Sequence, residues 1–367
     1  MADGVRVVHV VVAGDIGGAE RLLIDLATHP VETEATHAVA LLTSNPKLKR
    51  LFQDAGLVVH DGGPIRENPI AYLRRSLGFS TAAWIAGVMV RENAEVAHLH
   101  TLGSHVVGTR AALRARVPIL RTEHHTQYFI DPSSSAFTRW SLRRVDRSVA
   151  ISRYVGDFVA HTASFAAPKL RVVRNGVDAQ RFAAVAPPSP GGPFTFAVVS
   201  RLERWKRIDR VIAALESVAG ARLIIVGDGS ERRALEKVAR RLHLHSRVEF
   251  RGFQADPREA IAEAHACVNA SDDEPLGLAV LEAMSSGRLV VAYAGGAMPE
   301  LIASGERGWL VAQRSAEALA RAMLETASDR RRAAEMGLAA RAFIEKECTI
   351  ETMCRQYGAI YRELAAR

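Results

Sequence analysis

The sequence predicts an α/β protein built from two doubly wound, Rossmann-like domains that face each other across a cleft. The chain has 367 residues, which is long for one hydrophobic core and ample for two. Short apolar runs alternate with helical patterns along most of it, as βαβ units with parallel strands do. A stretch rich in proline and glycine, residues 185–193, interrupts this alternation, which then restarts.

Apolar runs place the expected strands, and amphipathic patterns place helices between them. The domains are expected at 1–182 and 194–346, with a linker at 183–193 and a final helical segment, 347–367, packing back on the first domain. Strands are expected at 5–12, 37–42, 57–59, 95–99, 118–122, 148–151, 169–173, 194–200, 222–226, 248–250, 266–269, 289–292 and 309–311. Helices are expected at 19–27, 72–90, 104–115, 137–145, 208–218, 231–242, 257–264, 278–286 and throughout 316–364.

The composition is that of a soluble globular protein. Hydrophobic residues make up 48% of the chain, and no apolar run reaches the roughly 20 residues that a membrane-spanning helix requires. The N-terminus does not resemble a signal peptide, and the three cysteines lack C-x-x-C spacing. We therefore expect reduced thiols, no zinc site and a cytoplasmic location.

The charge balance is basic, with a formal net charge of +8. This charge fits anionic ligands, an anionic membrane surface or nucleic acid. Because no block of basic residues is interleaved with aromatic ones, nucleic acid is the least favoured of the three.

The stretch 271–284 organises the candidate site. It follows an apolar strand, turns at Gly277 and continues as a helix, an arrangement whose free backbone amides and helix dipole favour anions. Glu274 and Glu282 bracket the helix start, where carboxylates suit sugar or ribose hydroxyls better than a phosphate. Two glutamates near a helix start are usually solvated. Their assignment to ligand hydroxyls therefore depends on the motifs that surround them in the sequence.

Two cations, Arg201 and Lys206, follow the strand expected at 194–200. Arginine as a bidentate fork and lysine as a point charge suit a diphosphate. The alternative is a solvated basic loop, which we expect for Arg204 and Arg207.

The first domain carries two weaker candidates. Gly17 and Gly18 follow the first strand, where close-approaching amides bind phosphate, although the pattern is not G-x-G-x-x-G and a tight structural turn is an equal alternative. His124 follows the strand at 118–122 and could donate to a sugar hydroxyl, but any one of the 13 histidines is more often structural.

Three further histidines were weighed as metal ligands. His98, His100 and His105 lie close in sequence, but no carboxylate or cysteine stands at ligand spacing with them. We therefore expect no metal ligands among them.

Taken in order, these motifs resemble the retaining GT-B glycosyltransferases of family 4, also called glycosyl transferases group 1. That family includes relatives of sucrose-phosphate synthases and bacterial mannosyl- and N-acetylglucosaminyltransferases. The resemblance covers nearly the whole chain. It rests on Gly17–Gly18, 122–124, 174–178, 200–202, Lys206, 226–229, 248–252, 274–282 and 295–302.

The resemblance implies a GT-B fold with C-terminal helices crossing back to the first domain, a nucleotide-diphosphate sugar on the second domain and the acceptor on the first. Arg201 and Lys206 would hold the diphosphate, Glu282 the ribose hydroxyls and Glu274 the donor sugar's hydroxyls. Amides near Leu276, Gly277 and Leu278 would support the sugar and phosphates, Gly17 and Gly18 would cover the diphosphate, and His124 would lie beside the reacting sugar.

The resemblance also implies chemistry without cofactor or metal, which fits the lack of a D-x-D cluster. The donor would be a UDP- or GDP-sugar, and transfer to a hydroxyl would retain anomeric configuration, with the leaving diphosphate as the base. Leu276 departs from the family, which commonly has an aromatic residue there.

Partners and alternatives stay open at this stage. The acceptor is expected to be a sugar, a lipid-linked sugar or a small molecule, and the chain a monomer or weak dimer. Basic segments at 72–90 and 139–153 allow peripheral contact with the inner face of an anionic membrane, although a core-facing helix with a solvated basic side is the preferred interpretation. The alternative functions are a nucleotide-sugar epimerase, a phosphorylase (for which no pyridoxal-phosphate lysine motif is evident) and an inactive sugar-nucleotide-binding protein.

Overall fold

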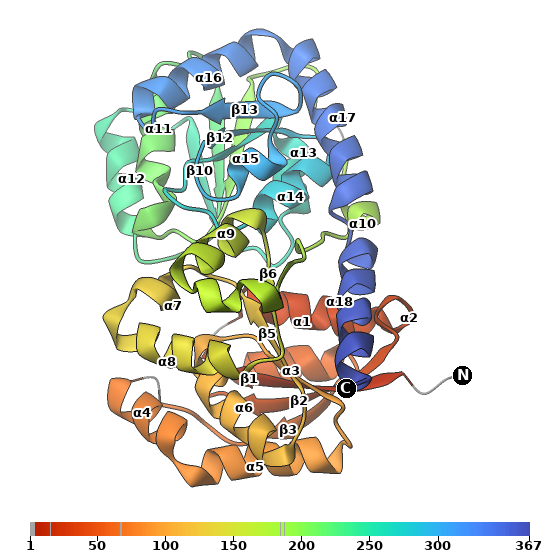
Figure 1. Ribbon diagram of the computed structural model, residues 1–367. Coiled ribbons are helices and arrows are strands. Elements are labelled where there is room, and N and C mark those ends of the chain that lie inside the picture. Colours follow the sequence, from red (N-terminus) through yellow and green to blue (C-terminus); the bar gives the residue numbers. More distant parts are fainter. Residues whose placement is uncertain (1–3, 15, 67, 184, 187) are drawn as a thin grey trace. The chain divides into compact units, whose positions relative to one another are not determined.

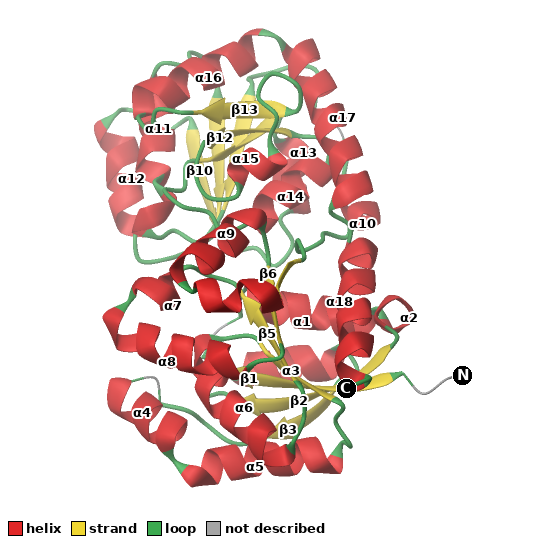
Figure 2. Cartoon of the chain, viewed as in Figure 1, coloured by secondary structure: helices red, strands yellow, loops and turns green. Residues whose placement is uncertain are grey.

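The computed structural model describes residues 4–14, 16–66, 68–183, 185–186 and 188–367 (Figure 1). The chain divides into two compact units. The first comprises the chain up to Asn175 together with Glu351–Arg367, and the second comprises Gly176–Ile350. Each unit consists of a parallel sheet with helices against it (Figure 2). Residues 184 and 187 of the predicted linker lie outside the described residues.

The described part of the first unit forms a seven-stranded sheet in the order β3-β2-β1-β4-β5-β6-β7, with every pairing parallel. Its strands are β1 (Val5–Val12), β2 (Ala35–Leu42), β3 (Val58–Asp61), β4 (Val96–Leu99), β5 (Ile119–Glu123), β6 (Arg147–Ala150) and β7 (Leu170–Val172). Its helices are α1 (Gly18–Thr28), α2 (Pro30–Thr33), α3 (Pro46–Asp54), α4 (Pro69–Leu77), α5 (Phe79–Arg91), α6 (Leu102–Ala115), α7 (Gln127–Ile130), α8 (Pro132–Arg144), α9 (Arg153–Thr162), η1 (Ser164–Lys169) and α18 (Ile350–Ala365).

Side chains of two different kinds fill one face of this sheet. Toward the carboxyl ends of β1 and β2, Val11 and Leu41 pack with Leu23 of α1 and Phe52 of α3. His9 lies two residues before Val11 and therefore points to the same face. There α18 adds polar contacts, because Tyr361 hydrogen-bonds to His98 and Tyr357 to Thr122.

The second unit's described strands form a six-stranded parallel sheet in the order β10-β9-β8-β11-β12-β13. They are β8 (Thr195–Val199), β9 (Arg222–Val226), β10 (Val248–Gly252), β11 (Ala266–Asn269), β12 (Leu289–Tyr293) and β13 (Gly308–Val311). The helices are α10 (Ala179–Ala183), η2 (Arg204–Lys206), α11 (Ile208–Glu216), α12 (Arg232–Arg241), α13 (Arg258–Glu263), α14 (Leu278–Ser285), α15 (Met298–Leu301), α16 (Ala316–Ser328) and α17 (Arg330–Glu347).

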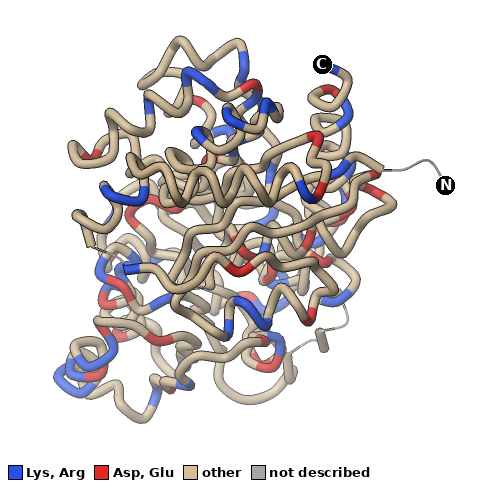
Figure 3. Tube along the Cα trace, turned by 90° about the horizontal axis from the view of Figure 1, so that it is seen from below, with Lys and Arg blue, Asp and Glu red and all other residues tan. Residues whose placement is uncertain are grey.

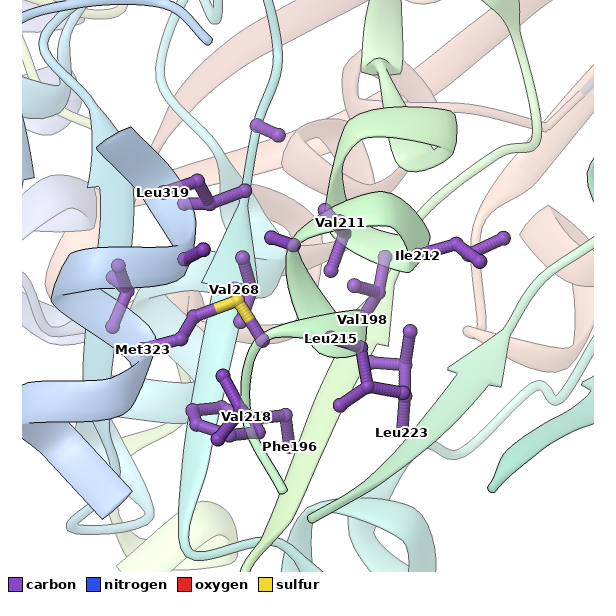
Figure 4. Packing of buried hydrophobic residues seen from close by; sticks show 14 of the residues in the cluster. Phe196, Val198, Val211, Ile212, Leu215, Val218, Leu223, Val268, Leu319 and Met323 are labelled. Atoms are coloured by element: carbon purple, nitrogen blue, oxygen red, sulfur yellow. The ribbon is translucent and has the colours of Figure 1, made fainter. Parts of the chain in front are cut away.

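The core of the second unit is apolar. Figure 4 shows Phe196 and Val268 of the sheet packed with Leu215 of α11 and with Leu319 and Met323 of α16. These side chains are nearly inaccessible to solvent. Burial of aliphatic and aromatic side chains is the main stabilising contribution in such a core.

Every expected strand overlaps an observed one, so the predicted two-sheet fold is confirmed. The boundary between units differs, because residues 176–182 cluster with the second unit and not the first. Val177 pairs there with Thr349, the Val177 amide donating to the Cys348 carbonyl at 2.9 Å. This pairing also holds residues 347–350 in the second unit.

The helix expected at 72–90 is two helices in the structure. Gly78 has extended backbone angles (φ −66°, ψ 153°), so α4 ends and α5 starts around it. Among the described residues, no helix combines the length and the apolar character needed to cross a membrane.

Candidate active site

The turn between β11 and α14 is fixed by glycines. Gly277 caps α14 with φ +88°, and a Cβ there would lie 3.1 Å from Met298 Cε and 3.2 Å from Glu274 Cγ. Gly296 has φ +57°, and a Cβ on it would overlap the Glu274 carbonyl oxygen at 2.2 Å. Glycine lets the backbone approach closely at both positions. The first amides of α14, which lack intrahelical partners, therefore open beside Glu274.

Glu274 is held by donors on one of its two oxygens. Its side chain is buried, with the residue 7% exposed. Lys206 Nζ lies 2.5 Å from Oε2, and Ser271 Oγ and Asn269 Nδ2 donate to the same oxygen at 2.9 and 3.4 Å. Within the described part of the chain, no donor reaches Oε1. That oxygen is available to accept a hydroxyl.

Lys206 belongs to the short helix η2, which follows β8. Its Nζ also lies 4.0 Å from the centroid of the Trp205 ring, a cation–π contact. The Asp272 amide donates to the Trp205 carbonyl at 2.9 Å, which ties η2 to the Glu274 loop. The family resemblance implies that Lys206 and Glu274 contact different parts of the donor, but the structure brings them together as an ion pair.

The neighbouring cations differ from one another. Arg201 is exposed, and its guanidinium has no partner among the described residues, so it is free to bind an anion. Arg207, expected to be solvated, instead pairs with Asp272 Oδ2 at 2.5 Å. The expectation was wrong because β8 and β11 are neighbours in the sheet, so their following loops meet at one edge. The same adjacency explains the Lys206–Glu274 pair.

The remaining residues of the motif are buried. The side chain of Leu276 belongs to the core, which leaves only its backbone for a ligand. Glu282 lies on α14 and is also buried. Burial raises the pKa of the Cys267 thiol to about 12, and the nearby Glu282 carboxylate adds to the rise. Small-molecule sites use a small number of such buried polar groups.

In the first unit, Gly17 and Gly18 open α1. Gly17 is the N-cap, and its amide donates to Glu20 Oε2 at 2.8 Å. Gly18 is the first helical residue. These glycines therefore lie at a helix N-terminus, although Glu20 already satisfies one amide.

His124 follows β5 and is buried, at 6% exposure. Burial, with smaller contributions from His100 and His125, holds its pKa well below the usual histidine value, so its imidazole is neutral near pH 7. Its Nε2 has no hydrogen-bond partner among the residues described. A neutral ring with a free nitrogen can donate to, or accept from, a hydroxyl.

Beyond His124 lies a cluster of buried histidines. His9 Nδ1 is 2.8 Å from His100 Nε2, and His9 Nε2 is 2.8 Å from His37 Nδ1. His98 bonds to Tyr361 Oη at 2.9 Å and to Thr122 Oγ1 at 2.8 Å. Parallel pairing of β1 with β4 places His9 opposite His98.

This cluster differs from the set considered in the sequence. His9, His98 and His100 bring ring nitrogens within 4.8 Å of one another, a spacing at which a metal could bind, whereas His105 is not in the group. Both nitrogens of His9 and of His98 are already hydrogen-bonded, and no carboxylate or thiolate joins the group in the described ranges. The arrangement is therefore that of a hydrogen-bonded core.

Two parallel α/β units, with charged loops at the carboxyl ends of the second sheet, define the GT-B class of glycosyltransferases. Residues 180–343 match the family model described as glycosyl transferases group 1, and residues 16–181 match that of glycosyltransferase family 4. The chain belongs to this glycosyltransferase family, as its motifs predicted.

Individual relatives are distant. The chain is 25% identical to N-acetyl-alpha-D-glucosaminyl L-malate synthase of Bacillus anthracis over 301 residues, which are 77% of this chain and 78% of that protein. It is 29% identical to glycogen synthase of Mycobacterium tuberculosis over 63% of this chain and 57% of that protein. HepE of Anabaena in complex with UDP has the same fold, with a TM-score of 0.81 and 23% identity, and the match covers 99% of this chain and 100% of that chain.

Proposed function

We propose that this protein transfers a sugar from a nucleotide-diphosphate sugar to a hydroxyl acceptor with retention of anomeric configuration. The observation that carries the proposal is the Lys206–Glu274 ion pair beside the N-terminus of α14. The unpaired Arg201 lies near it in the sequence, just after the end of strand β8. A UDP-sugar is the first candidate donor, with a GDP-sugar second. The UDP bound to HepE supports this order.

The second unit supplies groups for each part of such a donor. Lys206 has three ammonium hydrogens, so it can keep its bond to Glu274 and still donate to a phosphate oxygen. Arg201 adds a bidentate fork. The free Oε1 of Glu274 can accept a hydroxyl of the sugar, and Glu282 is assigned to the ribose hydroxyls. Amides at Leu276, Gly277 and Leu278 complete the anion site.

In the proposed reaction, the bond from the anomeric carbon to the phosphate oxygen breaks and a bond to the acceptor oxygen forms on the same face. The acceptor's proton moves to the departing phosphate oxygen. Arg201, Lys206 and the α14 amides stabilise the negative charge of the leaving group, a role assigned here without a metal or cofactor. Each such contact is typically worth about 10²–10³ in rate. Neutral His124 of the first unit is assigned to a hydroxyl of the reacting sugar.

The proposed acceptor is a hydroxyl compound: a sugar, a lipid-linked sugar or a small molecule. Action in the cytoplasm, as a monomer or weak dimer, is part of the same proposal. The unpaired Arg201 and the open oxygen of Glu274 favour a working transferase over an inactive sugar-nucleotide-binding protein. An epimerase would convert the donor without any acceptor. An assay of the donor in the absence of acceptor therefore distinguishes an epimerase from the proposed transferase.

The proposal is tested first by thermal shift with UDP, GDP, ADP and dTDP, with and without EDTA, on the wild type and Glu282→Ala. A ligand at a hundred times its Kd stabilises by about 2.7 kcal/mol, an easily measured shift. We expect one nucleotide to stabilise the wild type more than Glu282→Ala, unchanged by EDTA. No response to any nucleotide would contradict the proposal, and loss of the response in EDTA would contradict metal independence. NMR of the product then reports its anomeric configuration, and inversion would exclude the proposed substitution.

A further inference from the structure

Helix α4 presents an apolar stripe to solvent. Ile70, Leu73 and Leu77 recur at positions i, i+3 and i+7 of the helix and are 74%, 45% and 55% exposed. Phe79, just beyond the helix, is 81% exposed. Single exposed leucines are ordinary on protein surfaces. Four large apolar side chains along one helix face and its end form a patch, and such patches mark interaction sites.

The inward side of α4 is polar or aromatic instead. Ser76 is fully buried, and Tyr72 packs edge-on against Phe137 of α8 with ring centroids 6.1 Å apart. None of the helix's large aliphatic side chains is buried. A core-facing helix has the opposite arrangement. The stripe is therefore directed outward.

The patch is rigidly held. Arg110 of α6 donates from Nη1 to the carbonyls of Ser76 and Gly78 at 2.6 and 2.9 Å. Its guanidinium also lies 5.4 Å from the centroid of the Phe79 ring. The Asn68 side chain caps the N-terminus of α4 by accepting from the Ala71 amide at 2.8 Å. The corner between α4 and α5 is thus preformed.

Helix α4 itself is basic and carries no acidic residue. The sequence contains no aspartate or glutamate from 68 to 91, nor within α8. Arg74 lies next to Leu73 on the exposed side of α4, and Arg143 and Arg144 are exposed at the end of α8. Through the described ranges, none of these three arginines is paired with a carboxylate.

Several arginines at the surface of the second unit are paired with carboxylates. Arg331, Arg341 and Arg258 lie 3.0, 2.7 and 2.6 Å from the carboxylates of Glu335, Glu345 and Asp256. Lys and Arg occur over the whole trace (Figure 3). Arg201 and Arg204 are exposed and lack a carboxylate partner as well. What distinguishes α4 is that its unpaired Arg74 lies beside large exposed apolar side chains.

We propose that the α4 patch, defined as Ile70, Leu73, Arg74, Leu77 and Phe79, docks on the surface of an anionic lipid bilayer. Its apolar side chains would enter the boundary between headgroups and acyl chains while Arg74 faces lipid phosphates. A second copy of the chain is a poorer occupant, because a symmetric contact would bring the same unpaired arginines together. The proposal does not depend on the donor site.

The test is co-sedimentation of the full chain with vesicles of phosphatidylcholine containing phosphatidylglycerol, and of phosphatidylcholine alone. We expect the wild type to pellet with the anionic vesicles only. Leu73→Ser with Leu77→Ser should abolish pelleting. The matched control is Leu324→Ser with Leu338→Ser, which removes leucines 50% and 63% exposed on the second unit and should leave pelleting unchanged.

The charge contribution is measured separately. Arg74→Gln should lower the partition coefficient about fivefold, the value of one basic residue near an anionic surface. Arg331→Gln is the control and should change nothing. Unchanged melting temperatures show that each variant is folded.

Two results would overturn the proposal. One is wild-type pelleting at background level with anionic vesicles at low salt. The other is that the protein self-associates in light scattering, that Leu73→Ser with Leu77→Ser removes this self-association, and that the wild type binds no vesicles. This result would make the patch an interface between copies of the chain.

Discussion

The two units share an architecture but fill the space beneath their helices differently. In the second unit Phe196, Leu215 and Met323 form an apolar core between the sheet, α11 and α16. In the first unit α18 covers His9 and His98, whose nitrogens are all hydrogen-bonded. The comparison shows that a parallel sheet accommodates a polar interior in which most ring nitrogens are hydrogen-bonded, although Nδ1 of His100 has no partner among the described residues. It also makes the first unit more sensitive to protons than the second.

The largest expected difference between the units is their response to acid. Burial holds the pKa values of His9, His98 and His100 below the ordinary value, to about 3 for His100, and lowers that of His37 to about 4. The unfolded chain, with histidine pKa values near 6.5, therefore binds more protons below that pH. The free energy of unfolding should be highest above about pH 6.5 and should decrease steadily as the pH falls toward about pH 4. Each histidine should contribute a loss of about 1.4 kcal/mol for each unit by which its pKa differs between the folded and unfolded states. The other titratable groups that lie against these rings are Tyr357, Tyr361 and His124.

Urea unfolding near pH 7.5 and about pH 5 measures this loss. His98→Gln should make stability less dependent on pH. His245→Gln, which changes an exposed histidine of the second unit, should leave the pH dependence as it is. Equal pH dependence in the wild type and His98→Gln would refute the assignment.

The next largest effect concerns the charged pair of the second unit. Lys206→Met removes a cation assigned to the leaving group and should lower the transfer rate about 10²–10³-fold. It also leaves the buried Glu274 carboxylate without its cation, which lowers stability. Steady-state kinetics with the donor found by thermal shift, together with melting temperatures, measure both effects.

The double variant Lys206→Met/Glu274→Gln separates the two effects. It removes both charges, so the melting temperature should recover while the rate should not. Arg204→Gln, which changes an exposed neighbouring cation, should retain wild-type rate and stability. Recovery of the rate in the double variant would show that the pair is only structural.

The smallest effect compares one tyrosine in each unit. Tyr361→Phe leaves Nδ1 of the fully buried His98 unsatisfied and should cost about 1–3 kcal/mol. Tyr293 is also buried, but it donates at 3.0 Å to the carbonyl of the partly exposed Ser315, so Tyr293→Phe should cost only about 0.5–1.5 kcal/mol. Urea unfolding of both variants gives the comparison. Equal losses would mean that an unsatisfied Nδ1 of His98 costs no more than the loss of an ordinary hydrogen bond.

Sequence patterning was sufficient for the strands, their parallel arrangement and the motif around Glu274, because apolar runs and glycine turns are local signals. Pairing of Lys206 with Glu274 was not predictable in the same way. The pair forms because β8 lies beside β11 in the sheet. The order of strands in a sheet cannot be predicted from the local periodicity of the sequence.

Two other features were missed for related reasons. His9 joins His98 through the register of β1 on β4, and Tyr361 reaches them from 263 residues along the chain, so spacing alone could not assemble the cluster. The periodicity of α4 reveals an apolar stripe at Ile70, Leu73 and Leu77. It does not reveal whether the stripe faces the core or the solvent. A core-facing helix was the preferred expectation for this segment, whereas the stripe is exposed in the structure.

The return of α18 to the first sheet has a consequence for biosynthesis. The N-terminal segment leaves the ribosome first, yet the hydrogen bond between His98 and Tyr361 joins residues 263 positions apart. Domains generally fold in the order in which they are made. Here the second unit, Gly176–Ile350, is synthesised before the first can be completed. The histidines of the first unit therefore stay uncovered until α18 has been synthesised. We expect the second unit, although it is synthesised later, to complete its folding before the first.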